Sequence, residues 1–186
     1  MAMTVMTIGA AAVMSMQKAS VQGNSDARQT DLANSVARTV VERLQRDAMQ
    51  WTLPNGANPM TSNLSNAKLL ANTNAFGGWA LPNAYLNPPS GGTPEGYEFD
   101  ILGRDLPAAS PDTVFCVNYQ LYWLAPPSLP TEPGFLRADV RVLWSRYITG
   151  SPPAGWCESF VGSAIPDPTL YHAIYVSTSI RQGGGQ

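Results

Sequence analysis

Two apolar patterns follow one another in the first fifty residues. Residues 1–17 are mostly apolar and uncharged, and Lys18 is the first charged residue. From residue 19 to Trp51 there is no proline, and apolar residues recur at spacings of three and four, which indicates one stripe on a helix. The stripe comprises Leu32, Val36, Val40, Leu44 and Trp51, and Pro54-Asn55-Gly56 ends it. We predict one N-terminal helix over residues 1–52.

The first third of this helix, residues 1–17, fits no common class of soluble helix. A secretory signal would need a basic segment before its apolar run, and a soluble core helix would need a polar face. A membrane span needs about 20 apolar residues, slightly more than are present. We interpret the segment as most of a membrane or filament-core helix, to which we assign the residues Met3, Val5, Met6, Ile8, Gly9, Ala10, Val13 and Met14.

Residues 53–113 are rich in Pro, Asn and Gly and lack a strong period. Such a stretch is too long for a simple connection in a compact domain, so we expect short elements near residues 66–71 and 97–102. Phe76, Trp79 and Tyr85 are candidates for a partner-binding patch, but large aromatic side chains more often pack against their own core. We therefore expect an irregular region pinned to the rest of the molecule.

Three later segments alternate apolar and polar residues, as half-buried strands do. The predicted inward positions are Phe115, Val117, Tyr119, Leu121 and Trp123; Leu136, Ala138, Val140, Val142 and Trp144; and Leu170, His172, Ile174, Val176, Thr178 and Ile180. Arg137, Asp139 and Arg141 are predicted to face solvent. One apolar face per strand indicates an antiparallel sheet covered on one side only. We expect three to five strands within residues 114–181, covered by the helix stripe, in an α+β fold, and a disordered tail over residues 182–186.

Composition narrows the range of functions. Charged residues make up 13% of the 186 residues and the net charge is −2, so no basic field for nucleic acid exists. The two cysteines, Cys116 and Cys157, have no companion at metal-ligand spacing. We predict that they form a disulfide in an oxidising compartment, with two unpaired thiols as the alternative.

Catalytic or metal-binding motifs are not evident. The only histidine, His172, lies on the apolar side of a predicted strand, where a structural role is expected. The densest acidic group, Glu95, Glu98, Asp100 and Asp105, lacks the order of a calcium loop and is expected to be solvated. Asn63-Leu64-Ser65 fits a glycosylation sequence, a weak signal. We expect no enzyme, no metal and no cofactor.

The sequence of the predicted N-terminal helix, residues 1–52, resembles the stem of type IV pilins, and of PilV-type minor pilins in particular. We call this helix the stem. The resemblance lies in "MAMTVMTIGAAAVMSMQKA", with its Met16-Gln17 pair, and in "LANSVARTVVERLQRDA", from Leu32-Ala33 to Glu42-Arg43-Leu44. It covers about the first 50 residues, and beyond them only the layout is similar. The Gly and Glu of the family's processing segment would precede Met1, so the stem is expected to be truncated or its start misplaced.

The resemblance implies a structural subunit that is held in the inner membrane of a Gram-negative bacterium and then enters an extracellular pilus. Its implied partners are other minor pilins, the major pilin and a pilus-tip adhesin, and its implied roles are priming of assembly, adhesion and twitching motility. One alternative is a minor pseudopilin of a type II secretion system. A second is a membrane-tethered periplasmic module that binds ligands through Trp79, Tyr85 and Tyr97.

Overall fold

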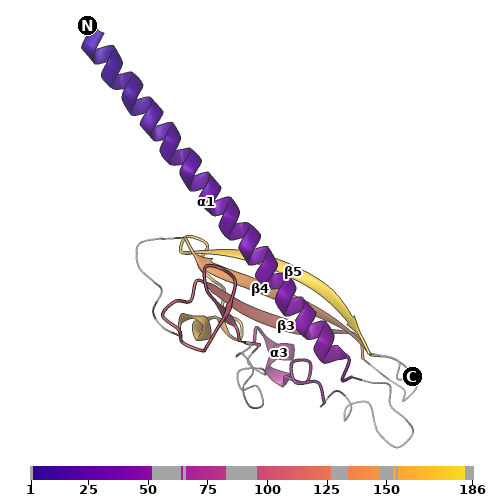
Figure 1. Cartoon of the computed structure of the whole chain (residues 1–186). Helices are drawn as coiled ribbons and strands as arrows, with labels where there is room; N and C mark the ends of the chain where they lie inside the picture. The colour runs from indigo at the N-terminus through magenta and orange to yellow at the C-terminus, as the bar shows by residue number, and fades with distance from the viewer. Residues whose placement is uncertain are drawn as a thin grey trace, which may run out of the picture.

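The computed structural model describes residues 2–51, 64, 66–82, 96–126, 134–146, 153 and 155–182, with side chains from residue 13 onward. A long helix, α1 (Ala2–Ala48), crosses one face of a five-stranded antiparallel sheet and projects far beyond it at its N-terminal end (Figure 1). The fold is α+β, as the sequence predicts. The absence of proline from residue 19 to Trp51 allows the helix to continue without a break.

The sheet contains two very short strands at one side and three long strands at the other. Its order is β2 (Asp105–Leu106), β1 (Glu98–Phe99), β3 (Phe115–Ala125), β4 (Phe135–Ser145) and β5 (Tyr171–Arg181). Val117 lies opposite Val142, and Val142 lies opposite Ile174. Side chains alternate between the faces of a sheet, so these three lie in one row on the same face.

The C-terminal half of α1 packs on that face. Val36, Val40 and Leu44 are almost completely buried and belong to one core with Val117, Val140 and other sheet residues. Leu32 is partly buried at the margin of this core. Full burial of such a side chain contributes about 1.5–3 kcal/mol, so the stripe attaches helix to sheet firmly.

Trp51 follows α1 and closes the end of this core. It is fully buried, and its ring lies against Gly134, where a Cβ would come within 2.4 Å of the ring. The ring edge also meets Trp123, with centroids 5.7 Å apart, and Trp123 stacks on Phe76. Trp123, predicted inward, is therefore part of the aromatic packing although 37% of it remains exposed.

The connecting region contains short elements, but not at every predicted position. A helix, α3 (Thr73–Gly77), begins after Asn72, whose side-chain oxygen accepts a hydrogen bond from the Asn74 N–H. The predicted site at residues 66–71 holds turns instead. Glu98–Phe99 lies within the other predicted stretch. At the far end of the sheet, Leu170 is exposed and precedes β5, so its predicted place in the strand is wrong.

Part of the second face of the sheet is covered too, which corrects the prediction of a sheet covered on one side only. A short 3-10 helix, η2 (Trp156–Phe160), folds back onto it and forms a second buried cluster. This cluster contains Tyr97, Cys116, Leu143, Trp156, Cys157 and Phe160. The connection between β4 and β5 is rich in Pro and Gly, and its few aromatic residues gave no periodic signal from which this cover could be read.

Candidate functional site

A run of exposed apolar side chains lies on the projecting part of α1. Side chains from Val13 to Asn24 are all exposed. The apolar ones are between 54% and 75% exposed: Val13, Met14, Met16 and Val21. A cluster of exposed apolar residues of this kind marks an interaction surface.

The other predicted residues of this segment precede the described side chains. Met3, Val5, Met6, Ile8, Gly9 and Ala10 belong to the backbone of α1, and their side chains lie outside the described part. The structure shows that α1 is continuous and carries this segment away from the sheet and the loops around it, which we call the head (Figure 1).

A buried cation, Arg43, fixes the stem to the edge of the head. Its guanidinium donates to the Gly96 carbonyl and to the Asp105 carboxylate, at 3.2 Å and 2.5 Å. It also lies 5.5 Å from the centre of the Phe99 ring. The sequence places Arg43 among the polar residues around the apolar stripe, and nothing in the helical period shows that it is buried.

Asp47 makes the second polar attachment of the stem. Its carboxylate accepts hydrogen bonds from the backbone N–H groups of Lys68, Leu69 and Leu70, at 2.8 to 3.0 Å. Hydrogen bonds to an ionised acceptor are stronger than neutral ones, and Asp47 is only 3% exposed. The carboxylate thus holds the turns before α3 against the end of α1. The sequence offers no signal for this contact, which joins residues 21 or more positions apart.

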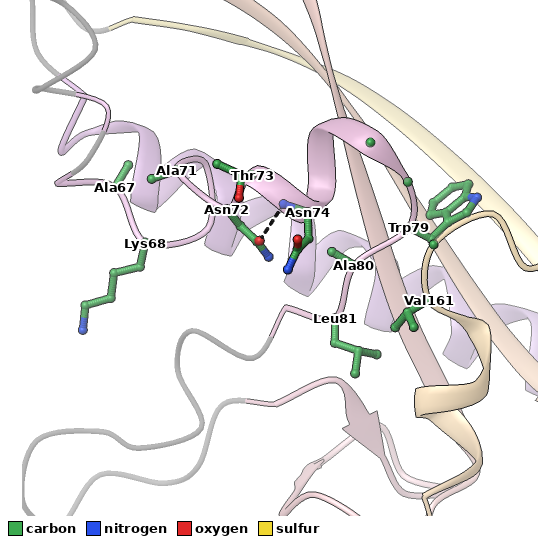
Figure 2. A pocket seen from close by; sticks show the side chains of 13 residues that line it. Ala67, Lys68, Ala71, Asn72, Thr73, Asn74, Trp79, Ala80, Leu81 and Val161 are labelled. Atoms are coloured by element: carbon green, nitrogen blue, oxygen red, sulfur yellow. Dashed lines mark hydrogen bonds between the residues drawn. The ribbon is translucent and has the colours of Figure 1, made fainter.

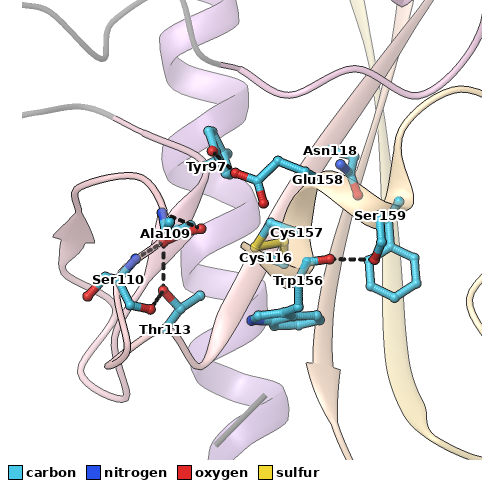
Figure 3. The surroundings of a disulfide bond; sticks show 12 residues. Tyr97, Ala109, Ser110, Thr113, Cys116, Asn118, Trp156, Cys157, Glu158 and Ser159 are labelled. Carbon is cyan, nitrogen blue, oxygen red and sulfur yellow. Dashed lines mark hydrogen bonds between the residues drawn. A yellow bond between two sulfur atoms is a disulfide. The ribbon is translucent and has the colours of Figure 1, made fainter. Parts of the chain in front are cut away.

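The predicted disulfide is present in the buried cluster on the second face. Cys116 on β3 and Cys157 on η2 are bonded, with their Cα atoms 5.5 Å apart (Figure 3). Beside it, the Tyr97 hydroxyl donates to Glu158 at 2.5 Å. Burial, followed by the Glu158 carboxylate, raises the pKa of Tyr97, so this hydroxyl keeps its proton at physiological pH. The bond closes a separation of 41 residues, which in the chain-entropy model contributes about 4 kcal/mol.

Arg141 does not face solvent, contrary to the sequence prediction. It is 1% exposed, and its guanidinium donates to the Asn118 side chain and to the carbonyl oxygens of Phe160 and Ala164. The Trp79 ring lies against it, 4.3 Å from centroid to guanidinium carbon. Burial lowers the pKa of Arg141, and its partners allow a charged group to remain inside. Arg137, by contrast, is exposed as predicted.

The acidic group is engaged in internal bonds. Glu98 is buried and accepts from the N–H groups of Ala109 and Ser110 and from the Thr113 hydroxyl. Asp100 pairs with Arg104, and Asp105 pairs with Arg43. Within the described ranges, no three acidic, His or Cys side chains converge as metal ligands. Glu95 and the sequence Asn63-Leu64-Ser65 fall wholly or partly outside those ranges.

His172 stacks on Trp144, with ring centroids 5.1 Å apart. Burial lowers the pKa of His172, Arg146 lowers it further, and Asp26 on α1 acts in the opposite direction. The His172 ring thus packs on the sheet at Trp144 and lies within electrostatic range of Asp26 on α1.

An open cavity of about 890 Å³ lies between residues 67–81 and the loop at Val161-Gly162 (Figure 2). Lys68 lies at one end of the cavity and Trp79 at the other. Asn72 and Asn74 lie between these two residues, and the Asn74 N–H donates a hydrogen bond to the Asn72 side chain. The aromatic residues proposed for ligand binding do not converge here. The Trp79 ring packs on Arg141 and Tyr175, Tyr97 is buried on the second face, and Tyr85 is outside the described residues.

Comparison of the chain with protein-family models, with curated proteins and with solved structures finds no match. A search of the described helices for a stretch both long and apolar enough to cross a membrane also finds none.

Proposed function

We propose that this chain is a minor pilin, a non-catalytic structural subunit of a type IV pilus. One observation carries the proposal: a single helix is packed to a head along its C-terminal half and presents exposed apolar side chains along its projecting half. Val13, Met14, Met16 and Val21 have no cover from the head, and apolar surface of this kind is stabilised when other apolar surface removes it from water. Stems of neighbouring subunits supply that cover in a filament.

The sequence resemblance supplies the finer part of the proposal. The inner membrane holds the subunit before assembly, and the stem then exchanges lipid for sister stems, so that apolar burial is retained. Gly9 and Ala10–Ala12 are small residues of the kind that permits close approach of helices. The partners are other minor pilins, the major pilin and a tip adhesin, and the outcome is assembly priming or a tip complex for adhesion and twitching motility.

A pair of charges on the projecting stem tests this proposal. Met14 and Val21 are seven positions apart, so they lie on nearly the same face of α1. The double variant Met14→Lys with Val21→Lys should fold normally, since neither side chain contacts the head, but should be missing from sheared filaments. The matched control is Gln17→Lys with Asn24→Lys, which adds the same charges at the same spacing to positions that are already polar and exposed.

The control should enter filaments like the wild type. Equal incorporation of both double variants would contradict the proposal, because apolar contact of the stem would then be irrelevant. If the apolar-face variant leaves filaments and twitching intact but abolishes protein secretion, the subunit belongs to a secretion pseudopilus instead.

A further inference from the structure

The two edges of the sheet are protected very differently. On one side, β2 contains only two residues, and charged pairs between Arg43 and Asp105 and between Arg104 and Asp100 surround it. On the other side, β5 runs for eleven residues and pairs with β4 without a register shift. Short strands, charges, prolines and bulges are the usual protection against pairing with another chain. β5 has no Pro, Lys, Asp or Glu.

The hydrogen-bond pattern shows which backbone groups of β5 face outward. Beyond its two ends, the Arg146 N–H donates to the Leu170 carbonyl, and the Gln182 N–H donates to the Gly134 carbonyl. Both bonds join residues that continue the β4–β5 register by one position, one pair at each end. In an antiparallel ladder such pairs alternate with pairs whose N–H and C=O groups point away from each other. Even-numbered residues of β5 therefore bond to β4, and odd-numbered residues present their backbone groups at the edge.

Four consecutive odd positions are open at this edge: Ala173, Tyr175, Ser177 and Ser179. Their side chains are exposed, and within the described part of the chain their outward backbone groups have no bonding partner. Tyr171 differs, because its N–H already donates to the Asp167 carbonyl. Alternating donors and acceptors at strand spacing are matched by the backbone of another extended chain.

Ile174 and Val176 indicate what side chains such a strand would carry. They lie on the α1 side of β5 and are only partly buried at the margin of the core. An added strand would place every second side chain beside them, where apolar side chains gain burial, while the other side chains would lie with Ser177 and Ser179 on an exposed polar surface. Ala173, Tyr175, Ser177 and Ser179 carry no charge, so nothing at the centre of the edge would pair with a charged side chain, and a neutral segment matches it best.

We propose that the β5 edge is a docking site for an extended, neutral segment of a different protein, which adds a sixth strand to the sheet. A second copy of this chain is the obvious alternative. However, α1 runs in the same direction as β5: Asp26 acts on His172 near the start of β5, and Trp51 lies at Gly134, which bonds to Gln182 just past its end. Antiparallel pairing of two β5 edges would point the two stems in opposite directions, which the proposed filament function forbids. The choice of partner rests on that function, whereas the open edge does not.

The test uses the full-length chain in detergent and a short synthetic peptide of alternating threonine and valine as the probe. We expect the amides of Ala173, Tyr175, Ser177 and Ser179 to exchange hydrogen rapidly in the free chain and slowly with peptide. Ser177→Pro removes one outward N–H and should weaken peptide binding by about tenfold, the value of one lost hydrogen bond at its upper end. Ser177→Ala keeps the N–H and should bind like the wild type.

Persistent protection of the even-numbered amides confirms that β5 of each variant is still folded. If Ser177→Pro disturbs the folding of β5, a second variant replaces it: Ser177→Lys with Ser179→Lys. This double variant adds charges and keeps every N–H, and it should also weaken peptide binding. Slow exchange of the four amides in the free monomer, or equal binding by all variants, would overturn the proposal. If the four edge amides exchange slowly whether or not peptide is present, and the chain sediments as a dimer, the occupant is a second copy of this chain. None of these readouts uses the stem, so failure here leaves the filament proposal to its own test.

Discussion

The two halves of α1 are continuous in backbone and opposite in environment. In the C-terminal half, apolar residues at helical spacing are buried: Val36, Val40 and Leu44 are at most 2% exposed. In the projecting half, Met14 and Val21 are about as apolar but largely exposed. Most of the stability of a protein helix comes from packing of its apolar face, so the C-terminal half supplies most of the stabilising contacts of α1. The packed half of the helix holds the protein together, and the projecting half is available to other molecules.

Truncation of the buried stripe should give the largest effect. Leu44→Ala removes a side chain that is fully buried between α1 and the sheet, and should lower the free energy of unfolding by about 3 kcal/mol through lost burial and the cavity left behind. Val21→Ala makes a comparable truncation in the projecting half and should change it by less than about 0.5 kcal/mol. Urea denaturation followed by tryptophan fluorescence measures both. Similar losses in the two variants would show that the projecting half packs on the head.

Removal of the Asp47 carboxylate, which attaches the stem to residues 68–70, should give the next largest loss in the free energy of unfolding. Asp47→Asn keeps the shape of the side chain but turns an NH2 group toward the N–H groups of Lys68, Leu69 or Leu70, and should cost about 2 kcal/mol. Asp31→Asn is the matched control, because Asp31 is exposed on the same helix. Amide exchange should also quicken at residues 68–70 in Asp47→Asn alone. Unchanged exchange there would mean that the turns hold their place without the carboxylate.

Gly23 allows the projecting half to be stabilised without touching the head. It lies in the middle of α1, and a Cβ added there meets nothing within 4 Å. Gly23→Ala should favour the local helix by about 1 kcal/mol and slow amide exchange in the neighbouring turns. The thermal midpoint of the head should stay the same, because the side chains of the projecting turns are exposed and these turns can unfold locally. A rise in that midpoint comparable to the local gain would show that the whole helix unfolds as one unit.

The sequence predicts the long helix and its buried stripe better than it predicts the head. Spacings of three and four place Val36, Val40 and Leu44 on one face, and this requires only local geometry. The β3–β4–β5 alternation and the Cys116–Cys157 disulfide are also confirmed. The second cover of the sheet could not be predicted, because the 3-10 helix that provides it has no period, and because Arg141 looks like a solvent-facing residue until Trp79 and the loop carbonyls surround it. Arg43 and Asp47 are hidden for the same reason: their partners are distant in sequence.

The smallest expected effect lies at the boundary between the halves, where Asp26 of α1 acts on His172 of β5. Burial and Arg146 lower the pKa of His172 below its usual 6.5, and Asp26 partly offsets this. Near pH 7.5 the ring is neutral in both states and contributes no pH dependence. As the pH falls through about 6.5, the unfolded chain takes up the proton first, so stability declines until the folded pKa is reached. His172 is the only histidine, so His172→Gln should lose less stability than the wild type between about pH 7.5 and about pH 5.5. Asp26→Asn, which removes the opposing charge, should lose more. Equal losses in the wild type and Asp26→Asn, with a smaller loss in His172→Gln, all measured by urea midpoints, would mean that α1 does not hold Asp26 beside the sheet in solution. The boundary between the packed and projecting halves would then lie further along the helix.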